Sequence, residues 1–352
     1  MSAWLAVLVL TLTATVLFVL PLIPGLRELY FSSDAQPLTV VQQHAGEIRY
    51  FANSFRNYIS VLNEPLERCA HAGGAIRGVL PDGVQYLITG ENDSSLLETT
   101  RQSNCPYLIA ATVDLLVPGE TTFSHDIYAR RNFAGGKGNR YRAILGEQDI
   151  ELGSSSTVAR WVHAVGKLHA QENCDLHGRT SSDLSIRLHR GCAFQRLNAP
   201  CIELGEVNAQ LLLPVPGTET PAEAVPQRFL HEGDYEIAAG AVLVGNLCVR
   251  GDLVIRRGAR VLGSVKSGAR LTVEPSASIA GGLVSMQEMH IGKGSSVHGP
   301  IIAERRLVIE EQSRCGEISR PTTVTASHIE VAEGTVIFGS LWAREFGVVV
   351  AR

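Results

Sequence analysis

Aromatic residues are scarce in this sequence. They account for 6% of the 352 residues, whereas 45% of the residues are hydrophobic and 34 are glycine. A wide globular core needs bulky rings to fill it, so few rings and many glycines favour a narrow, ladder-like β interior. Long basic runs are also missing, and the formal net charge is −4. Because a nucleic-acid-binding surface needs a basic stripe, we expect no nucleic-acid partner.

The seven cysteines include no CxxC pair. This excludes the common zinc and dithiol redox motifs. An odd number of cysteines also favours a reducing compartment, where thiols stay unpaired. We therefore expect buried free thiols, no metal and no cofactor.

Residues 3–23 carry no charge. A helix of this length, rising about 1.5 Å per residue, reaches roughly 30 Å, the thickness of a bilayer core. No basic residue precedes the run and no Ala-x-Ala cleavage site follows it, which favours an uncleaved transmembrane anchor over a signal peptide. Arginines follow the segment, so we expect a single-pass protein of the inner (cytoplasmic) membrane with its bulk in the cytoplasm, the periplasmic side being the alternative. The expected anchor residues are Trp4, Leu5, Val7, Leu8, Leu10, Leu12, Val16, Leu17, Phe18 and Leu20.

Between residues 38 and 62, apolar residues alternate at spacings of three and four. This seam predicts an amphipathic helix. Two interpretations stay open: a helix that self-associates next to the membrane, or a helix that packs onto its own domain. The seam consists of Leu38, Val41, Ala45, Ile48, Ala52, Phe55, Ile59 and Leu62. For residues 66–130 we expect a small α+β segment with a hairpin turn at 81–83.

An 18-residue repeat dominates the rest of the chain. Its starting positions are Ile150, Leu168, Ile186 and Ile202, and then Tyr235, Leu253, Leu271, Met289, Leu307 and Ile329. Counted from each start, apolar or small residues recur at offsets 0, 2, 6, 8, 12 and 14, which is three pairs with the strand period of two. A chain with three short strands per turn gives this pattern, so we predict an all-β fold, a parallel β-helix with 18-residue rungs.

Four prolines between 214 and 226 interrupt the repeat, because proline cannot donate a ladder hydrogen bond. The expected domains are 1–25 (transmembrane anchor), 26–130 (membrane-proximal helix and small α+β segment), 131–205 (first β-helix block), 206–232 (Pro-rich loop or linker) and 233–352 (second block).

The later rungs resemble bactofilins, the bacterial polymer-forming cytoskeletal proteins. The resemblance rests on residues 253–265 (LVIRRGARVLGSV), 289–303 (MHIGKGSSVHGPIIA) and 329–340 (IEVAEGTVIFGS), and it covers about 233–346. It implies a right-handed β-helix that associates end to end into filaments without nucleotide. It also implies membrane attachment and a scaffolding role in cell shape or envelope assembly. The anchor and the roughly 100 residues that precede the rungs depart from the family pattern.

Enzymatic alternatives are weaker. A hexapeptide-repeat acyltransferase, a left-handed β-helix, needs an aliphatic residue every six positions, but offset 14 holds mostly alanine, serine and proline. It also needs a histidine as general base, and we interpret the outward histidines as solvated surface residues: His163, His169, His177, His189, His290 and His298. A β-helix lyase or hydrolase needs stacked carboxylates, and Gly292 separates Glu274 from Glu310. We therefore expect a protein without enzymatic activity.

The ends of a β-helix expose unpaired backbone, so end-on pairing is its natural mode of association. We predict self-association, either end to end or through the helix over 38–62. The bilayer and other envelope proteins are the remaining expected partners. The candidate assembly contact is the C-terminal tail, through Phe346, Val348, Val349 and Val350.

Overall fold

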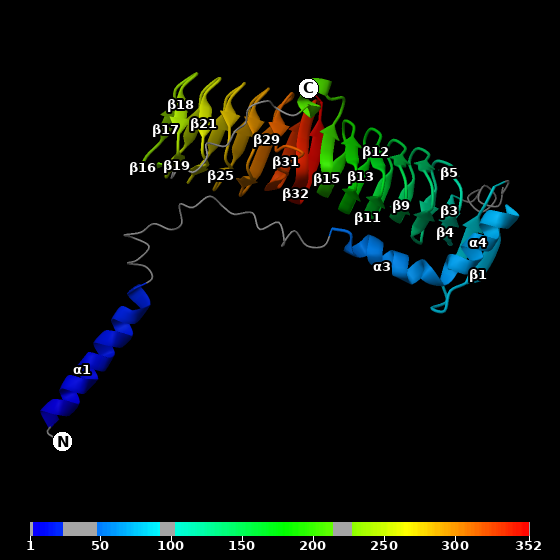
Figure 1. The fold of residues 1–352 in the computed structure, drawn as a ribbon, viewed down its shortest axis with the longest axis horizontal. Helices are drawn as coiled ribbons and strands as arrows, with labels where there is room; N and C mark the ends of the chain where they lie inside the picture. The colour runs from blue at the N-terminus through cyan, green and yellow to red at the C-terminus, as the bar shows by residue number, and fades with distance from the viewer. Residues whose placement is uncertain (1–2, 24–47, 92–102, 214–226, 352) are drawn as a thin grey trace. The chain divides into compact units, whose positions relative to one another are not determined.

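The computed structural model describes residues 3–23, 48–91, 103–213 and 227–351. The chain divides into two compact units, Met1–Val40 and Val41–Arg352. The second unit is a β-solenoid of about 13 turns with few helices, so the predicted all-β repeat fold is confirmed (Figure 1).

The described part of the first unit is helical. The α-helix α1 spans Ala3–Val19, and the 3-10 helix η1 spans Leu20–Leu22. Pro21 lies at the start of η1, where proline, lacking an N–H, does not continue an α-helix. No helix in the described residues is long and apolar enough to cross a membrane, so the predicted transmembrane helix over 3–23 is not found in that form. All the predicted anchor residues lie in α1 or η1.

Three short helices begin the second unit: α3 (Tyr50–Ile59), η4 (Ser60–Leu62) and α4 (Asn63–Ala72). The seam residues Ala52, Phe55, Ile59 and Leu62 are buried in one cluster with Trp161 and other residues on the outer face of the solenoid. The interpretation of a helix packed onto its own domain is thus confirmed for this stretch. Its apolar face is occupied within the chain, so it offers no seam to a second copy. Seam residues 38–47 lie outside the described ranges.

The first solenoid block begins earlier than predicted. The expected hairpin at 81–83 joins the antiparallel strands β1 (Ile76–Val79) and β2 (Gln85–Thr89). From residue 104 onward the strands pair in parallel, for example Asn104 with Thr122 and Leu115 with Phe133, each pair 18 residues apart. Residues 103–130 are therefore rungs rather than part of a small α+β segment. The strands of this block after β2 are β3 (Asn104–Cys105), β4 (Leu108–Ala111), β5 (Leu115–Val117), β6 (Thr122–Phe123), β7 (Ile127–Ala129), β8 (Phe133–Gly135), β9 (Arg140–Gly146), β10 (Ile150–Leu152), β11 (Thr157–Ala164), β12 (Lys167–Ala170), β13 (Asp175–Ser182), β14 (Ser185–Leu188) and β15 (Ala193–Leu204).

The second block follows the predicted register. Tyr235 pairs with Leu253, Leu253 with Leu271 and Leu271 with Met289. A short 3-10 helix, η5 (Ala209–Leu212), lies between the two blocks in sequence. The strands are β16 (Arg228–His231), β17 (Tyr235–Ile237), β18 (Val242–Val244), β19 (Asn246–Val249), β20 (Leu253–Ile255), β21 (Arg260–Leu262), β22 (Val265–Ser267), β23 (Leu271–Val273), β24 (Ser278–Ile279), β25 (Leu283–Ser285), β26 (Met289–Ile291), β27 (Ser296–Val297), β28 (Ile301–Ala303), β29 (Arg306–Ile309), β30 (Arg314–Cys315), β31 (Thr322–Ala332) and β32 (Thr335–Val350).

The two blocks form one rod, but they progress along it in opposite directions (Figure 1). The chain winds inward from one end to β15, then starts again at the far end with β16 and winds back. The last rungs of the blocks meet in the middle, where β15 pairs antiparallel with β32. The rod therefore carries the first rung of a block at each of its ends.

Candidate functional site

The middle of the rod contains an end-to-end junction between two β-helices. On one side of the rung Leu197 pairs with Leu341, and on the other two sides Phe194 pairs with Gly347 and Ile202 with Ile337. In the 18-residue frame, the first side pairs with its counterpart and the other two sides exchange. The junction therefore has approximate two-fold symmetry.

Side chains reinforce this junction. The guanidinium of Arg196 lies over the Trp342 ring, 4.1 Å from its centre, in cation–π geometry. The Asn198 side-chain amide donates to Ser340 Oγ at 2.6 Å. One chain thus already shows how two rung ends can be joined by antiparallel pairing on three sides.

The C-terminal tail, predicted as the assembly contact, lies inside this junction. Val348 pairs with Ala193 on one edge of β32 and with Glu330 on the other. Val349 is buried, Val348 and Val350 are half-buried, and only Phe346 is exposed. Because both edges of this strand have partners, the predicted contact is corrected: the tail joins the two blocks and is not a free edge.

The end of the rod formed by the first block is covered. Its inward side chains Cys105, Leu115 and Val117 are at most 5% exposed. The hairpin of β1 and β2 continues one side of the solenoid beyond β4. This end therefore presents no open apolar interior.

The other end of the rod is open. Strands β16, β17 and β18 each pair with one strand only within the described residues, namely β19, β20 and β21. Phe229 and Tyr235 occupy inward positions but remain 40% and 38% exposed, whereas the residues paired with them one turn later, Leu247 and Leu253, are buried. Further apolar side chains exposed on this end rung are Leu230, Val242 and Val244. The open rung over residues 228–244 is the candidate functional site.

Charged side chains near the open rung have partners within the block. Arg256 bridges Glu236 and Glu274, with an N–O distance of 2.7 Å to each. Hydrogen bonds from Arg256 lower the pKa of both carboxyl groups. Arg270 contacts Asp252 in the same way at 2.6 Å and lowers its pKa. Since these charges are compensated locally, the unsatisfied features of the open rung are its apolar side chains and backbone edge.

Two of the outward histidines are not solvated, which corrects the sequence interpretation. His163 is 2% exposed, and its Nδ1 lies 2.9 Å from Ser181 Oγ. His298 is 6% exposed, and its Nδ1 lies 2.8 Å from Glu317 Oε1. Burial lowers the pKa of both. The 18-residue frame places these residues outward correctly, but it carries no signal for the other side chains that cover the outer face.

The other predicted histidines lie on the outer surface. His169 and His189 approach each other with 2.7 Å between their Nε2 atoms. His177 pairs with Asp175 at 2.9 Å and His290 with Glu310 at 3.0 Å, partners that the spacing did not indicate. Within the parts of the chain that the structure describes, no group of three or more His, Cys, Asp or Glu residues is placed to hold a metal ion.

No family model, curated protein or solved structure matches this chain. The functional assignment therefore rests on the residues and on their geometry.

Proposed function

We propose that this chain is a non-enzymatic structural scaffold, a β-solenoid rod that associates end to end with a second copy through its open rung. The carrying observation is the asymmetry of the rod's ends. One end buries its inward side chains, whereas the other leaves Phe229 and Tyr235 partly exposed beside strands with an unpaired edge. Such an edge is a template for another strand.

The internal junction supplies the pairing mode. Applied to the open rung, its symmetry pairs β16 with the same strand of the second copy and β17 with the second copy's β18. In this arrangement Phe229 faces its own counterpart, and Tyr235 faces Leu243 of the other copy. Burying each half-exposed large side chain contributes roughly 1 kcal/mol, and the paired edges add backbone hydrogen bonds.

A rod with one open end forms a dimer and not a filament. This departs from what the bactofilin resemblance implies, because the second rung end is already used in the internal junction. The resemblance of residues 233–346 still supports a scaffolding role in cell shape or envelope assembly. It also supports a right-handed coil, the sense that parallel crossover connections strongly prefer.

We further propose that the N-terminal segment holds the rod at a lipid bilayer, with the bulk on the cytoplasmic side of the inner membrane. Every described side chain of α1 is exposed, and the helix contains no charged residue. A helix that is apolar all round belongs in a protein core or in lipid. The hydroxyls of Thr11, Thr13 and Thr15 donate to carbonyl oxygens one turn earlier, at 2.7 to 2.8 Å, as suits an apolar solvent. Deleting residues 1–25 should move the protein from the membrane to the soluble fraction, and continued sedimentation with membranes would contradict the anchor.

Sedimentation velocity of the full chain in detergent tests end-on association. The bonds from Arg260 N to Ala241 O and from Gly245 N to Leu262 O place the ladder on alternate residues. The N–H of Val244 therefore points to the open edge. Val244→Pro removes this donor without removing a bond inside the block, so we expect a dimer to become a monomer.

Val244→Thr is the matched control, because threonine keeps the N–H and the β-branched shape. It should remain dimeric. A monomeric wild-type chain would contradict end-on association, and filaments would contradict the single open end. A discrete trimer would instead favour the acyltransferase alternative.

A further inference from the structure

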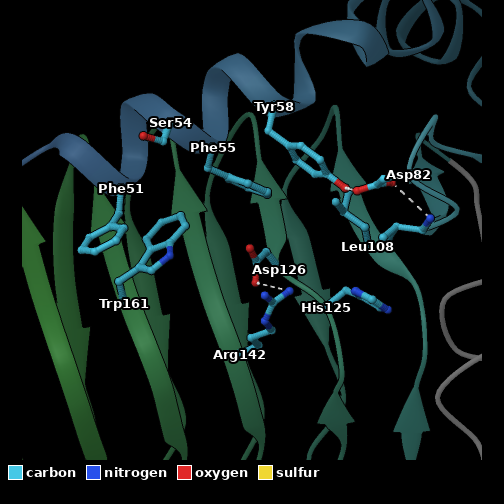
Figure 2. Close-up of a pocket in the computed structure, with 11 residues that line it drawn as sticks. Phe51, Ser54, Phe55, Tyr58, Asp82, Leu108, His125, Asp126, Arg142 and Trp161 are labelled. Carbon is cyan, nitrogen blue, oxygen red and sulfur yellow. Dashed lines mark hydrogen bonds and ion pairs between the residues drawn. The ribbon is translucent and has the colours of Figure 1, made fainter.

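A cleft lies between α3 and the outer face of the first block, far in sequence from the open rung (Figure 2). Its volume of about 400 Å³ lies within the roughly 300–1,000 Å³ typical of small-molecule sites. Trp161, Phe55 and Leu108 contribute apolar walls and are buried. Phe51 and Tyr58 add partly exposed rings from the helix side.

Two charged groups face the cleft without closing a hydrogen bond between them. The Oδ1 atom of Asp126 is buried and has no hydrogen-bond partner. The nearest cation is Arg142, whose Nη1 lies 3.5 Å away, whereas a charge-assisted hydrogen bond measures about 2.7–2.9 Å. Burial raises the pKa of Asp126. An acceptor and a donor thus point into the same space with capacity to spare (Figure 2).

The opposite wall of the cleft is already satisfied. Tyr58 donates its hydroxyl to Asp82 Oδ2 at 2.7 Å, and Asp82 Oδ1 accepts from the backbone N–H of Val84 at 3.2 Å. These bonds tie α3 to the β1–β2 turn and fix the rim. Burying a carboxylate oxygen without a partner costs free energy. The uncompensated position of Asp126 therefore indicates a group that a ligand completes.

The geometry points to a neutral, hydroxyl-rich ligand, such as a sugar ring, bound in this cleft between Asp126 and Arg142. A hydroxyl donates and accepts at once, so it can donate to the carboxylate and accept from the guanidinium. A cationic ligand would be repelled by Arg142, and an anionic one by Asp126 and Asp82. The apolar face of a sugar ring would lie against the rings of Phe51 and Tyr58.

Calorimetric titration of the full chain in detergent tests this site. The probes are methyl glucoside and N-acetylglucosamine as neutral sugars, choline as a cation and acetate as an anion. We expect a neutral sugar to bind, and Asp126→Asn to weaken that binding at least tenfold, because a hydrogen bond to a charged group is lost. Asp114→Asn is the matched control, since Asp114 is exposed on the same block and bonds to the Asn132 backbone N–H outside the cleft.

Thermal unfolding at pH 7 separates binding from folding. Asp126→Asn should be at least as stable as the wild type, because it removes a poorly partnered buried charge. Binding of choline or acetate in place of the sugars would overturn the ligand class. Absence of binding by every probe, or equal sugar affinity in Asp126→Asn, would overturn the site. The titration is repeated on the Val244→Pro variant, so its outcome does not depend on end-on association.

Discussion

The junction between the two blocks allows a sharp mutational prediction at Gly347. A Cβ added there would lie 2.3 Å from the nearest ring carbon of Phe194, with two further ring carbons within 2.7 Å. Carbon atoms pack at about 3.5–4.0 Å, so the ring would have to move by more than 1 Å. Phe194 is 2% exposed and has no space to move into. Gly347→Ala should therefore destabilise the fold by about 1–3 kcal/mol, the usual cost of overpacking.

Urea unfolding of the full chain, followed by far-UV circular dichroism, measures this loss. Gly74→Ala is the matched control, because an added Cβ at Gly74 would meet no atom within 4 Å. Phe194→Leu combined with Gly347→Ala should recover part of the loss, since the smaller side chain makes room. Direct neighbours show coupling energies of about 0.5–3 kcal/mol. Strict additivity of the two substitutions, or a Gly347→Ala variant as stable as the control, would refute the antiparallel contact between β15 and β32.

Two further predictions concern single buried groups. Ser285 is 1% exposed, and its Oγ lies 2.7 Å from the Ala269 carbonyl oxygen and accepts from the Gln287 N–H at 3.3 Å; Ser285→Ala should cost about 1–2 kcal/mol in urea unfolding, and an unchanged midpoint would show that the hydroxyl is dispensable. Burial lowers the pKa of His163 below its ordinary 6.5, so its stabilising contribution is complete above that pH and is lost as the pH falls below it. The unfolding midpoint should therefore drop between pH 7 and pH 5, and His163→Gln should flatten that drop; an equal slope in both proteins would contradict this assignment.

The sequence predicts the second block well because its inward columns are uniform. Aliphatic residues repeat every 18 positions from Tyr235 onward, and alternate residues are polar or exposed. The signal weakens before Ile150. There the outer face of the strands is apolar as well, with Ala110, Leu108 and Leu145 buried under the helices of the second unit. A strand that is buried on both faces loses the alternation that identifies it.

The junction left no signal in the sequence. It pairs residues 193–204 with 335–350, and antiparallel contacts of this separation have no period to detect. The tail could be recognised as a strand, but its partner could not be assigned. The open rung was likewise hidden, because Phe229 precedes the first recognised repeat start, and the choice of end depends on the opposite directions of the two blocks.

A disulfide between two copies tests the central claim most directly. The two-fold pairing of β16 brings Phe229 opposite its counterpart, and opposite residues in antiparallel strands have Cα atoms about 4.5–5.5 Å apart, within the range of disulfides. Oxidation of the full-length Phe229→Cys variant should give a covalent dimer that is lost when Val244→Pro is added. A variant that stays monomeric under oxidation while the wild type sediments as a dimer would place the contact elsewhere and contradict end-on association through the open rung.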